Sequence, residues 1–284
     1  MIETLKYATI SSIYVKDIFF YSINDEKKLI DFHNNYGISY FPSKDRKSIF
    51  KYDGEKFVNE ELTESFKCKP NDLLFDDSTI KKFEENNHDE VLFVTDNDVI
   101  IGVVHIVDYN NEFIYFEFYK LIFYFENMLR EFLELKGESN KSLLNWMKDY
   151  GSRKGKDYWK NQYNRYVPAD NPKKLATLEE KRKNLKPFQT FLMSDLLQFG
   201  ISKKYFSDNF KKYVADIKNI RNRIAHSTDF TGKSDTHASK SEETLYKIDE
   251  LKKFIKEIKS FFNAYNELEE LVKSNKMQST TTPL

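Results

Sequence analysis

The chain lacks the features that mark secreted and membrane proteins. A single cysteine, Cys68, excludes an internal disulfide and a zinc cage. No stretch approaches the roughly 18 apolar residues that a membrane span needs. The N-terminal "MIETLKYATI" lacks the basic-then-apolar form of a signal peptide. We therefore expect a cytoplasmic protein without a membrane partner.

The net charge of the chain is zero, because 45 Lys+Arg balance 45 Asp+Glu. This balance hides an asymmetry. Residues 151–230 contain 18 basic and 8 acidic side chains, a net charge of +10, so the remainder carries −10. Such a segment is either a local site for polyanions or a solvated helical face. With 40% hydrophobic and 32% charged residues, the 284-residue chain is typical of a soluble globular protein of about two domains.

The first half of the sequence contains two similar units. "DIFFYSINDEKKLIDF" from Asp17 and "DLLFDDSTIKKF" from Asp72 each run from a strand-like start through a polar turn into a helix-like stretch. The units end at Asp53 and Asp108, and each pair of aspartates is 55 residues apart. A repeat of this length predicts two copies of one supersecondary unit that bury each other's apolar faces. In the second copy, "EVLFVTDNDVIIGVVHIVDYN" (90–110) predicts a β-hairpin with a turn at "TDND".

The predicted β-α-β-β pattern, present twice over residues 8–110, resembles tandem cystathionine-β-synthase (CBS) domains, which form a Bateman module. The family signature Gly-x-x-Thr/Ser-x-x-Asp corresponds to Gly102, His105 and Asp108, with His105 replacing the hydroxyl residue. In the first copy only Asp53 remains. The resemblance implies binding of an adenine nucleotide (AMP, ATP or a cyclic oligoadenylate), with an aspartate on the ribose diol. The alternatives are a degenerate module that only dimerises, and an inert His105.

From about residue 112 the apolar period changes from 2 to 3.6, which predicts helices. "NEFIYFEFYKLIFYFENMLREFLELKG" reads as one long helix ending at Gly137, apolar nearly all round and therefore buried or in an interface. Residues 151–174 are predicted to be a basic loop with helical patches. Further helices are predicted over "SLLNWMKDYG", "KPFQTFLMSDLLQFGI", "KKYFSDNFKKYVADIKNIRNRIAHS" and the stripe from Leu245 to Leu268, which together give a bundle of about five helices.

The stretch "IRNRIAH" carries Arg221, Asn222 and His226 late in one of these helices. A bundle with this motif resembles the HEPN domain (higher eukaryote and prokaryote nucleotide-binding), whose signature is Arg-x4–6-His with a polar residue after the arginine. Many members also carry Glu-x-x-x-Arg on an early helix, which Glu126 and Arg130 supply. The resemblance covers about residues 112–275. For Glu126 and Arg130 the sequence favours a buried structural pair over direct catalysis.

Many HEPN proteins are ribonucleases that need no metal, because the RNA 2′-hydroxyl is the nucleophile. The resemblance implies that His226 moves the proton and that Arg221 neutralises the transition state. Asn222 lies one helical turn from His226 and would fix its tautomer or touch phosphate. Arg221 is five residues from His226, about 140° round the helix, so we expect a homodimer with a composite site. Arg223 is an alternative phosphate contact, and "STDFTG" is expected to form the rim of an RNA cleft.

The expected fold is therefore α+β. It comprises a CBS pair of two β-α-β-β units over 1–110, an all-α HEPN bundle over 111–276 and a disordered tail over 277–284. The expected function is a metal-independent HEPN-type endoribonuclease, regulated by an adenine nucleotide, that cuts single-stranded RNA or tRNA as a toxin or defence effector. The alternative is a non-catalytic dimeric protein that binds nucleotide or RNA. We expect no metal and no cofactor for catalysis.

Overall fold

Two units make up the computed structural model, which describes residues 2–85, 91–153, 155–226, 228–231 and 248–280. One unit combines Met1–Tyr119 with Arg223–Lys256, and the other combines Lys120–Asn222 with Glu257–Leu284. Each unit is therefore assembled from segments that are far apart in the sequence. Three helices run through the division, namely α4 (Glu112–Leu135), α9 (Asp208–His226) and α10 (Ile248–Thr280).

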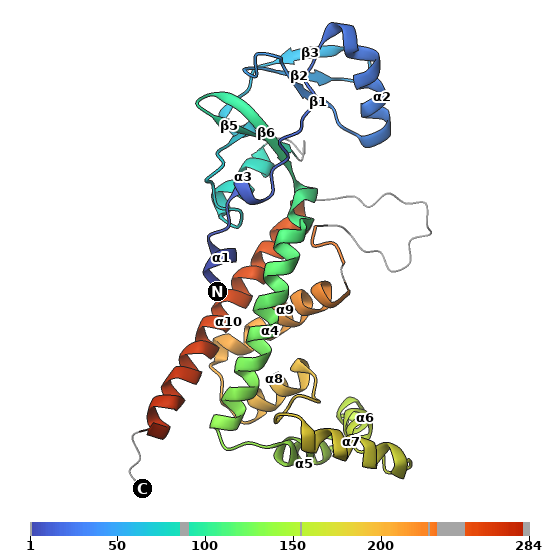
Figure 1. The fold of residues 1–284 in the computed structure, drawn as a ribbon, viewed down its shortest axis with the longest axis vertical. Helices are drawn as coiled ribbons and strands as arrows, with labels where there is room; N and C mark the ends of the chain where they lie inside the picture. The colour runs from blue at the N-terminus through green and yellow to red at the C-terminus, as the bar shows by residue number, and fades with distance from the viewer. Residues whose placement is uncertain (1, 86–90, 154, 227, 232–247, 281–284) are drawn as a thin grey trace. The chain divides into compact units, whose positions relative to one another are not determined.

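The first unit holds two small three-stranded sheets (Figure 1). In the first sheet, β1 (Tyr40–Pro42), β2 (Ile49–Tyr52) and β3 (Phe57–Glu60) are antiparallel and follow helix α2 (Glu26–Tyr36). In the second, β4 (Lys67–Cys68) is parallel to β5 (Val91–Asp96), which pairs antiparallel with β6 (Val99–His105). The connections are helix α1 (Ile2–Lys6), helix α3 (Asp77–Glu85) between β4 and β5, and the 3-10 turns η1 (Ile10–Ser12), η2 (Ile23–Asp25), η3 (Glu64–Phe66) and η4 (Ile106–Asn110).

The second predicted repeat unit lies in a segment of β-α-β-β order, but the first strand of that segment, β4, precedes Asp72, and the predicted strand-like start "DLLF" forms only an isolated bridge between Leu73 and Thr9. The first predicted unit does not have this order. Its order is α-β-β-β, because the stretch from Asp17 that was predicted to begin as a strand is irregular. There Tyr21 donates from its backbone N–H to the Pro42 carbonyl at 2.7 Å, while its ring stacks on Phe50 at 3.7 Å. Single contacts with the first sheet therefore replace a ladder of backbone hydrogen bonds, and the prediction of a β-α-β-β order in the first predicted unit is wrong.

The predicted hairpin over 91–105 is confirmed. Its turn residues Asn97 and Asp98 have φ values of 48° and 60°, the left-handed conformation that Asn and Asp tolerate in tight hairpin turns. Val91, Phe93 and Val103 join Tyr40 and Ile49 of the first sheet in one buried cluster. The core between the two sheets is therefore built from residues that alternate along the strands.

The second unit is helical, as predicted. Besides its parts of α4, α9 and α10 it contains α5 (Asn140–Gly151), α6 (Asp157–Tyr166), α7 (Pro172–Asn184) and α8 (Met193–Ser202). Phe125 of α4 packs on Phe261 of α10 with ring centroids 5.4 Å apart, and Phe206 stacks on Phe210 of α9 at 4.2 Å. The first contact joins α4 to α10, whereas the second is local to the start of α9. The segment 151–174, predicted to be a loop with helical patches, contains all of α6 and the first residues of α7.

Helix α8 begins later than the sequence predicts. The run "KPFQTFLMSDLLQFGI" suggested a helix from about Lys186, but Phe188 has a φ of 62°, which a right-handed helix cannot accommodate. Phe188 is fully buried, and its backbone N–H donates to the Asn140 side chain at 2.7 Å. Gly200 lies in the last turn of α8, which ends at Ser202, and a Cβ there would be 2.4 Å from the Phe206 ring.

At the C-terminus, α10 continues to Thr280 and so covers 277–280 of the predicted disordered tail, whereas 281–284 lie outside the described residues. Within the described part of the chain, none of the helices is long and apolar enough to cross a membrane.

Candidate functional site

A cavity of about 600 Å³ lies in the first unit, between the start of β1 and the end of β6. Its wall is mostly aliphatic and aromatic, and its polar members are Asp17, Ser39, Tyr40 and His105. The described lining contains neither lysine nor arginine. An apolar wall with a few polar groups is typical of small-molecule sites. The composition suits the base and sugar of a nucleotide better than its phosphates, which would gain no ion pair from this wall.

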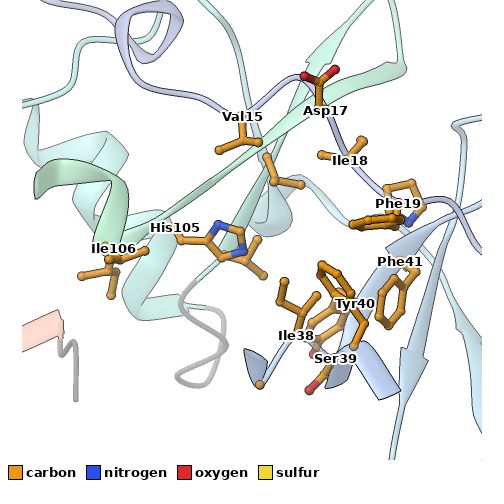
Figure 2. A pocket seen from close by; sticks show the side chains of 16 residues that line it. Val15, Asp17, Ile18, Phe19, Ile38, Ser39, Tyr40, Phe41, His105 and Ile106 are labelled. Carbon is orange, nitrogen blue, oxygen red and sulfur yellow. The ribbon is translucent and has the colours of Figure 1, made fainter. Parts of the chain in front are cut away.

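His105 is the member of the predicted nucleotide site that lines this cavity. It ends β6 and caps η4, where its imidazole accepts from the Asp108 backbone N–H. Its Nδ1 is 3.5 Å from Asp108 Oδ2. The ring extends toward Ile38 and Tyr40 (Figure 2), so it can contact a ligand in the cavity.

The other three predicted nucleotide contacts have local structural roles and do not line the cavity. Asp108 accepts from the His105 backbone N–H at 2.7 Å and completes the cap of η4. Gly102 allows close approach, because a Cβ there would be 2.4 Å from the Tyr14 ring and 2.5 Å from the Val15 carbonyl. That approach permits the bridge between Val15 and Val103.

Asp53 lies in the turn between β2 and β3. Its carboxylate accepts from the backbone N–H groups of Lys56 and Glu55, both at 2.9 Å. These bonds, the one from Lys56 first, hold the pKa of the Asp53 carboxyl below its ordinary value. Asp53 therefore stabilises a hairpin turn.

The predicted catalytic residues lie at the end of α9, where the division between the units falls between Asn222 and Arg223. In the second unit, Lys218, Arg221 and Asn222 occupy one face of the helix, with the spacing i, i+3 and i+4. They line a small cavity of about 170 Å³ with residues 192–194 of α8 and its N-cap. Arg221 also reaches the Asn222 side-chain oxygen at 3.5 Å. Two cations and an amide make this cavity suitable for a phosphate group.

His226 is the last residue of α9 and is exposed. The chain that follows is anchored at 228–231. There the Phe230 backbone N–H donates to Asn110 Oδ1 at 2.6 Å, and the Tyr115 hydroxyl donates to the Thr228 carbonyl at 2.6 Å. Phe230 and Thr231 are fully buried. Residues 228–231 therefore do not form the exposed rim that the sequence suggested, while 227 and 232 lie outside the described residues.

Arg223 ties the end of α9 to that anchored segment. Its guanidinium donates to the Phe230 carbonyl and, at 3.4 Å, to the Asp229 carbonyl, and it lies 3.8 Å from Glu250. Its side chain is 16% exposed. A guanidinium with these partners is a structural brace, so the geometry favours Arg221 over Arg223 as the phosphate contact.

Glu126 and Arg130 form the predicted pair within α4. Arg130 donates to the Glu126 carboxylate at 3.0 Å and to the Asn127 side chain at 3.2 Å. The Arg130 and Glu126 side chains are 15% and 21% exposed. The contacts support the interpretation of this pair as structural.

Sequence reasoning missed Asp195, which is fully buried in α8 directly after the residues that line the smaller cavity. Its Oδ2 accepts from the Tyr166 hydroxyl at 2.7 Å, and that hydroxyl accepts from the Leu192 backbone N–H at 3.2 Å. This network fixes the first turn of α8. Asp195 gives no sequence signal because its importance comes from burial. Lys218, also missed, could have been found from its i−3 spacing to Arg221.

Asp195 makes the stability of the protein depend on pH. Burial raises the pKa of its carboxyl above the ordinary 3.8, so the folded state keeps a proton that the unfolded chain releases. The contribution of Asp195 to stability should therefore be fully present below about pH 3.8 and fall by up to about 1.4 kcal/mol per pH unit until the raised pKa is passed. Asp195→Asn should remove this fall. Urea unfolding of both proteins from about pH 3 to about pH 7 measures it, and equal pH profiles would contradict the assignment.

Among the described residues, no group of three or more His, Cys, Asp or Glu side chains is arranged to hold a metal ion. No protein-family model, curated protein or solved structure matches the chain.

Proposed function

We propose that the protein is an endoribonuclease that cleaves RNA without a metal, with Arg221, Asn222 and His226 as its catalytic residues. The observation that carries this proposal is the cationic cavity at Lys218, Arg221 and Asn222, on the same continuous helix that ends at the exposed His226. The proposal rests on the chemistry of these side chains together with the HEPN-like motif.

In the proposed reaction the 2′-oxygen of RNA attacks the adjacent phosphorus, and the bond from phosphorus to the 5′-oxygen breaks. His226 takes the proton of the 2′-hydroxyl or delivers one to the leaving 5′-oxygen. Arg221 neutralises the charge that develops on the phosphate oxygens. The products are a 2′,3′-cyclic phosphate and a 5′-hydroxyl.

Homodimerisation is part of the proposal. Arg221 and His226 are separated by about 140° round an ideal helix, so one chain presents them on different faces, and a two-fold partner would complete the site. Exposed aromatic residues support an interface on α4, where Phe116, Tyr119 and Phe123 are 61%, 63% and 56% exposed.

Regulation by a small molecule is the second part. We propose that the cavity beside His105 takes the base and ribose of an adenine nucleotide and leaves its phosphates toward solvent. The absence of lysine and arginine from the described lining supports this orientation.

The test is cleavage of a labelled single-stranded RNA by the purified chain in excess EDTA. We expect fragments to accumulate with EDTA at the same rate as without it. A chain that leaves RNA intact in both conditions, with and without added adenosine, AMP and ATP, would favour the non-catalytic binding protein instead.

A further inference from the structure

Very little of the surface of helix α7 is buried. Its 13 residues include none that is buried. Leu175, Leu178 and Arg182 are the half-buried ones, and their spacing of three and four residues defines a single narrow stripe toward the protein. Most stability of a helix in a protein comes from packing of an apolar face. An exposed helix with so little packing presents nearly its whole surface to a partner.

The exposed surface of α7 is basic. The helix carries five Lys or Arg against two Glu, so its net charge is +3. Lys173, Lys174, Lys181 and Lys183 are all exposed. One of them, Lys183, lies 3.6 Å from Glu180, but these side chains are 74% and 67% exposed, and a pair of that kind stabilises little. Binding of these four lysines to phosphates would therefore break no strong ion pair within the protein.

Arg182 differs from these lysines because it faces the protein. Its guanidinium donates to the Tyr166 carbonyl at 2.7 Å and lies over the Phe191 ring at 5.6 Å. These contacts hold α7 beside the C-terminus of α6. The charges of α7 thus belong to a positioned surface.

Helix α6 adds an exposed aromatic ring to the cations. Tyr158 is 53% exposed, and its ring meets Trp159 edge-on at 5.0 Å, with Trp159 in turn 4.9 Å from Trp146. Lys160 and Arg165 on the same helix are exposed. Aromatic rings beside cations bind single-stranded nucleic acid, since unpaired bases can stack where duplex bases cannot.

We infer that α6 and α7 form a docking surface for single-stranded RNA, separate from the residues that cut it. This inference rests on the proposed function, because it names how that substrate is held. Tyr166, the last residue of α6, donates from its hydroxyl to Asp195 of α8, which directly follows the residues 192–194 that line the small cavity. The C-terminus of α6 therefore lies next to the turn of α8 that forms the cavity with Arg221.

The test is RNA binding by the full chain carrying His226→Ala, which keeps the RNA uncut. Fluorescence anisotropy of a short labelled single strand compares this protein with one in which the four exposed lysines of α7 are also alanine. We expect affinity to fall about tenfold or more, and the slope of log K against log salt to fall by about 0.7 for each phosphate that is no longer neutralised by a lysine. The matched control replaces four exposed lysines of the first unit with alanine, namely Lys27, Lys44, Lys47 and Lys56.

Tyr158 tests the single-strand preference. Tyr158→Ala should weaken binding about tenfold by removing the stacking surface, whereas Tyr158→Phe keeps the ring and should bind like the parent.

Unchanged binding of the α7 variant, equal loss in the control variant, or stronger binding of duplex RNA or anionic vesicles than of single strands would overturn the inference. If the α7 variant loses binding but the parent never cuts RNA, the result supports the docking surface and contradicts the proposed nuclease activity. If the parent cuts RNA and the α7 variant binds RNA normally, the result supports the nuclease activity and contradicts the docking surface.

Discussion

His226→Ala is expected to reduce RNA cleavage at least about a hundredfold while leaving the fold intact. General acid–base catalysis by a positioned side chain typically contributes a factor of about 100 to 10,000. His226 is exposed at the last position of α9, so its removal costs little packing. Initial rates on a labelled RNA, with circular dichroism to check folding, measure the effect. His33→Ala, on α2, removes a histidine outside the proposed site and should cut like the parent.

Mixing two inactive variants tests whether the site is composite. A protein with Arg221→Ala retains His226, and one with His226→Ala retains Arg221. If each site draws these residues from different chains, every mixed dimer regains one of its two sites, and random exchange restores about a quarter of the parent rate. Failure to recover activity despite demonstrated subunit exchange would contradict the composite site, and full activity of His226→Ala alone would contradict the site itself.

Phe230→Ala should lower the free energy of unfolding of the protein by about 3 to 5 kcal/mol. Phe230 is fully buried, and its ring stacks on Phe254 at 4.2 Å and on Tyr115 at 4.3 Å. Its carbonyl also accepts from Arg223. Truncation leaves a cavity beside two rings and loosens the segment that anchors the end of α9. Urea or thermal unfolding gives the loss directly.

A matched truncation on the surface separates burial from the mere loss of a ring. Tyr7, which directly follows α1, is 54% exposed, so Tyr7→Ala should change the free energy of unfolding by no more than about 0.5 kcal/mol. A loss at Phe230 as small as this would show that residues 228–231 do not anchor α9.

The features that sequence reasoning predicted depend on neighbours along the chain. The long helix α4 follows from apolar residues at a period of 3.6 and from Glu126 and Arg130 four residues apart. It stops where Gly137 takes a φ of 75°, a conformation that glycine adopts without strain. The β5–β6 hairpin follows from alternating apolar residues and an Asn-Asp turn. Local periodicity suffices for such elements.

The features that it missed depend on contacts between distant segments. Asp17 through Tyr21 have the composition of a strand, but Tyr21 is held by Pro42 and Phe50 rather than by a neighbouring strand. The late start of α8 is set by the buried Phe188 and its bond to Asn140. The cavity beside His105 likewise needs β1 and β6 brought together. No local sequence pattern encodes these contacts between distant segments.

For the candidate sites, the sequence pointed to side chains that have defined contacts in the structure, but it did not predict the role of each one. His105 lines a cavity, but Asp53 and Asp108 use their carboxylates to accept from backbone N–H groups. An aspartate that caps a turn and one that binds a ribose look alike in a sequence. The same limit applies to Arg223, whose use as a brace becomes visible only once the fold brings Phe230 beside it.

The most direct test of the central claim is the chemistry of the new RNA ends. The parent protein is incubated with a defined single-stranded RNA in EDTA, and the fragments are examined by mass spectrometry. Attack by the 2′-hydroxyl predicts a 2′,3′-cyclic phosphate on one fragment and a 5′-hydroxyl on the other, with no cleavage where the 2′-hydroxyl is replaced by hydrogen. Fragments with a 3′-hydroxyl and a 5′-phosphate, or cleavage at a deoxy position, would contradict it.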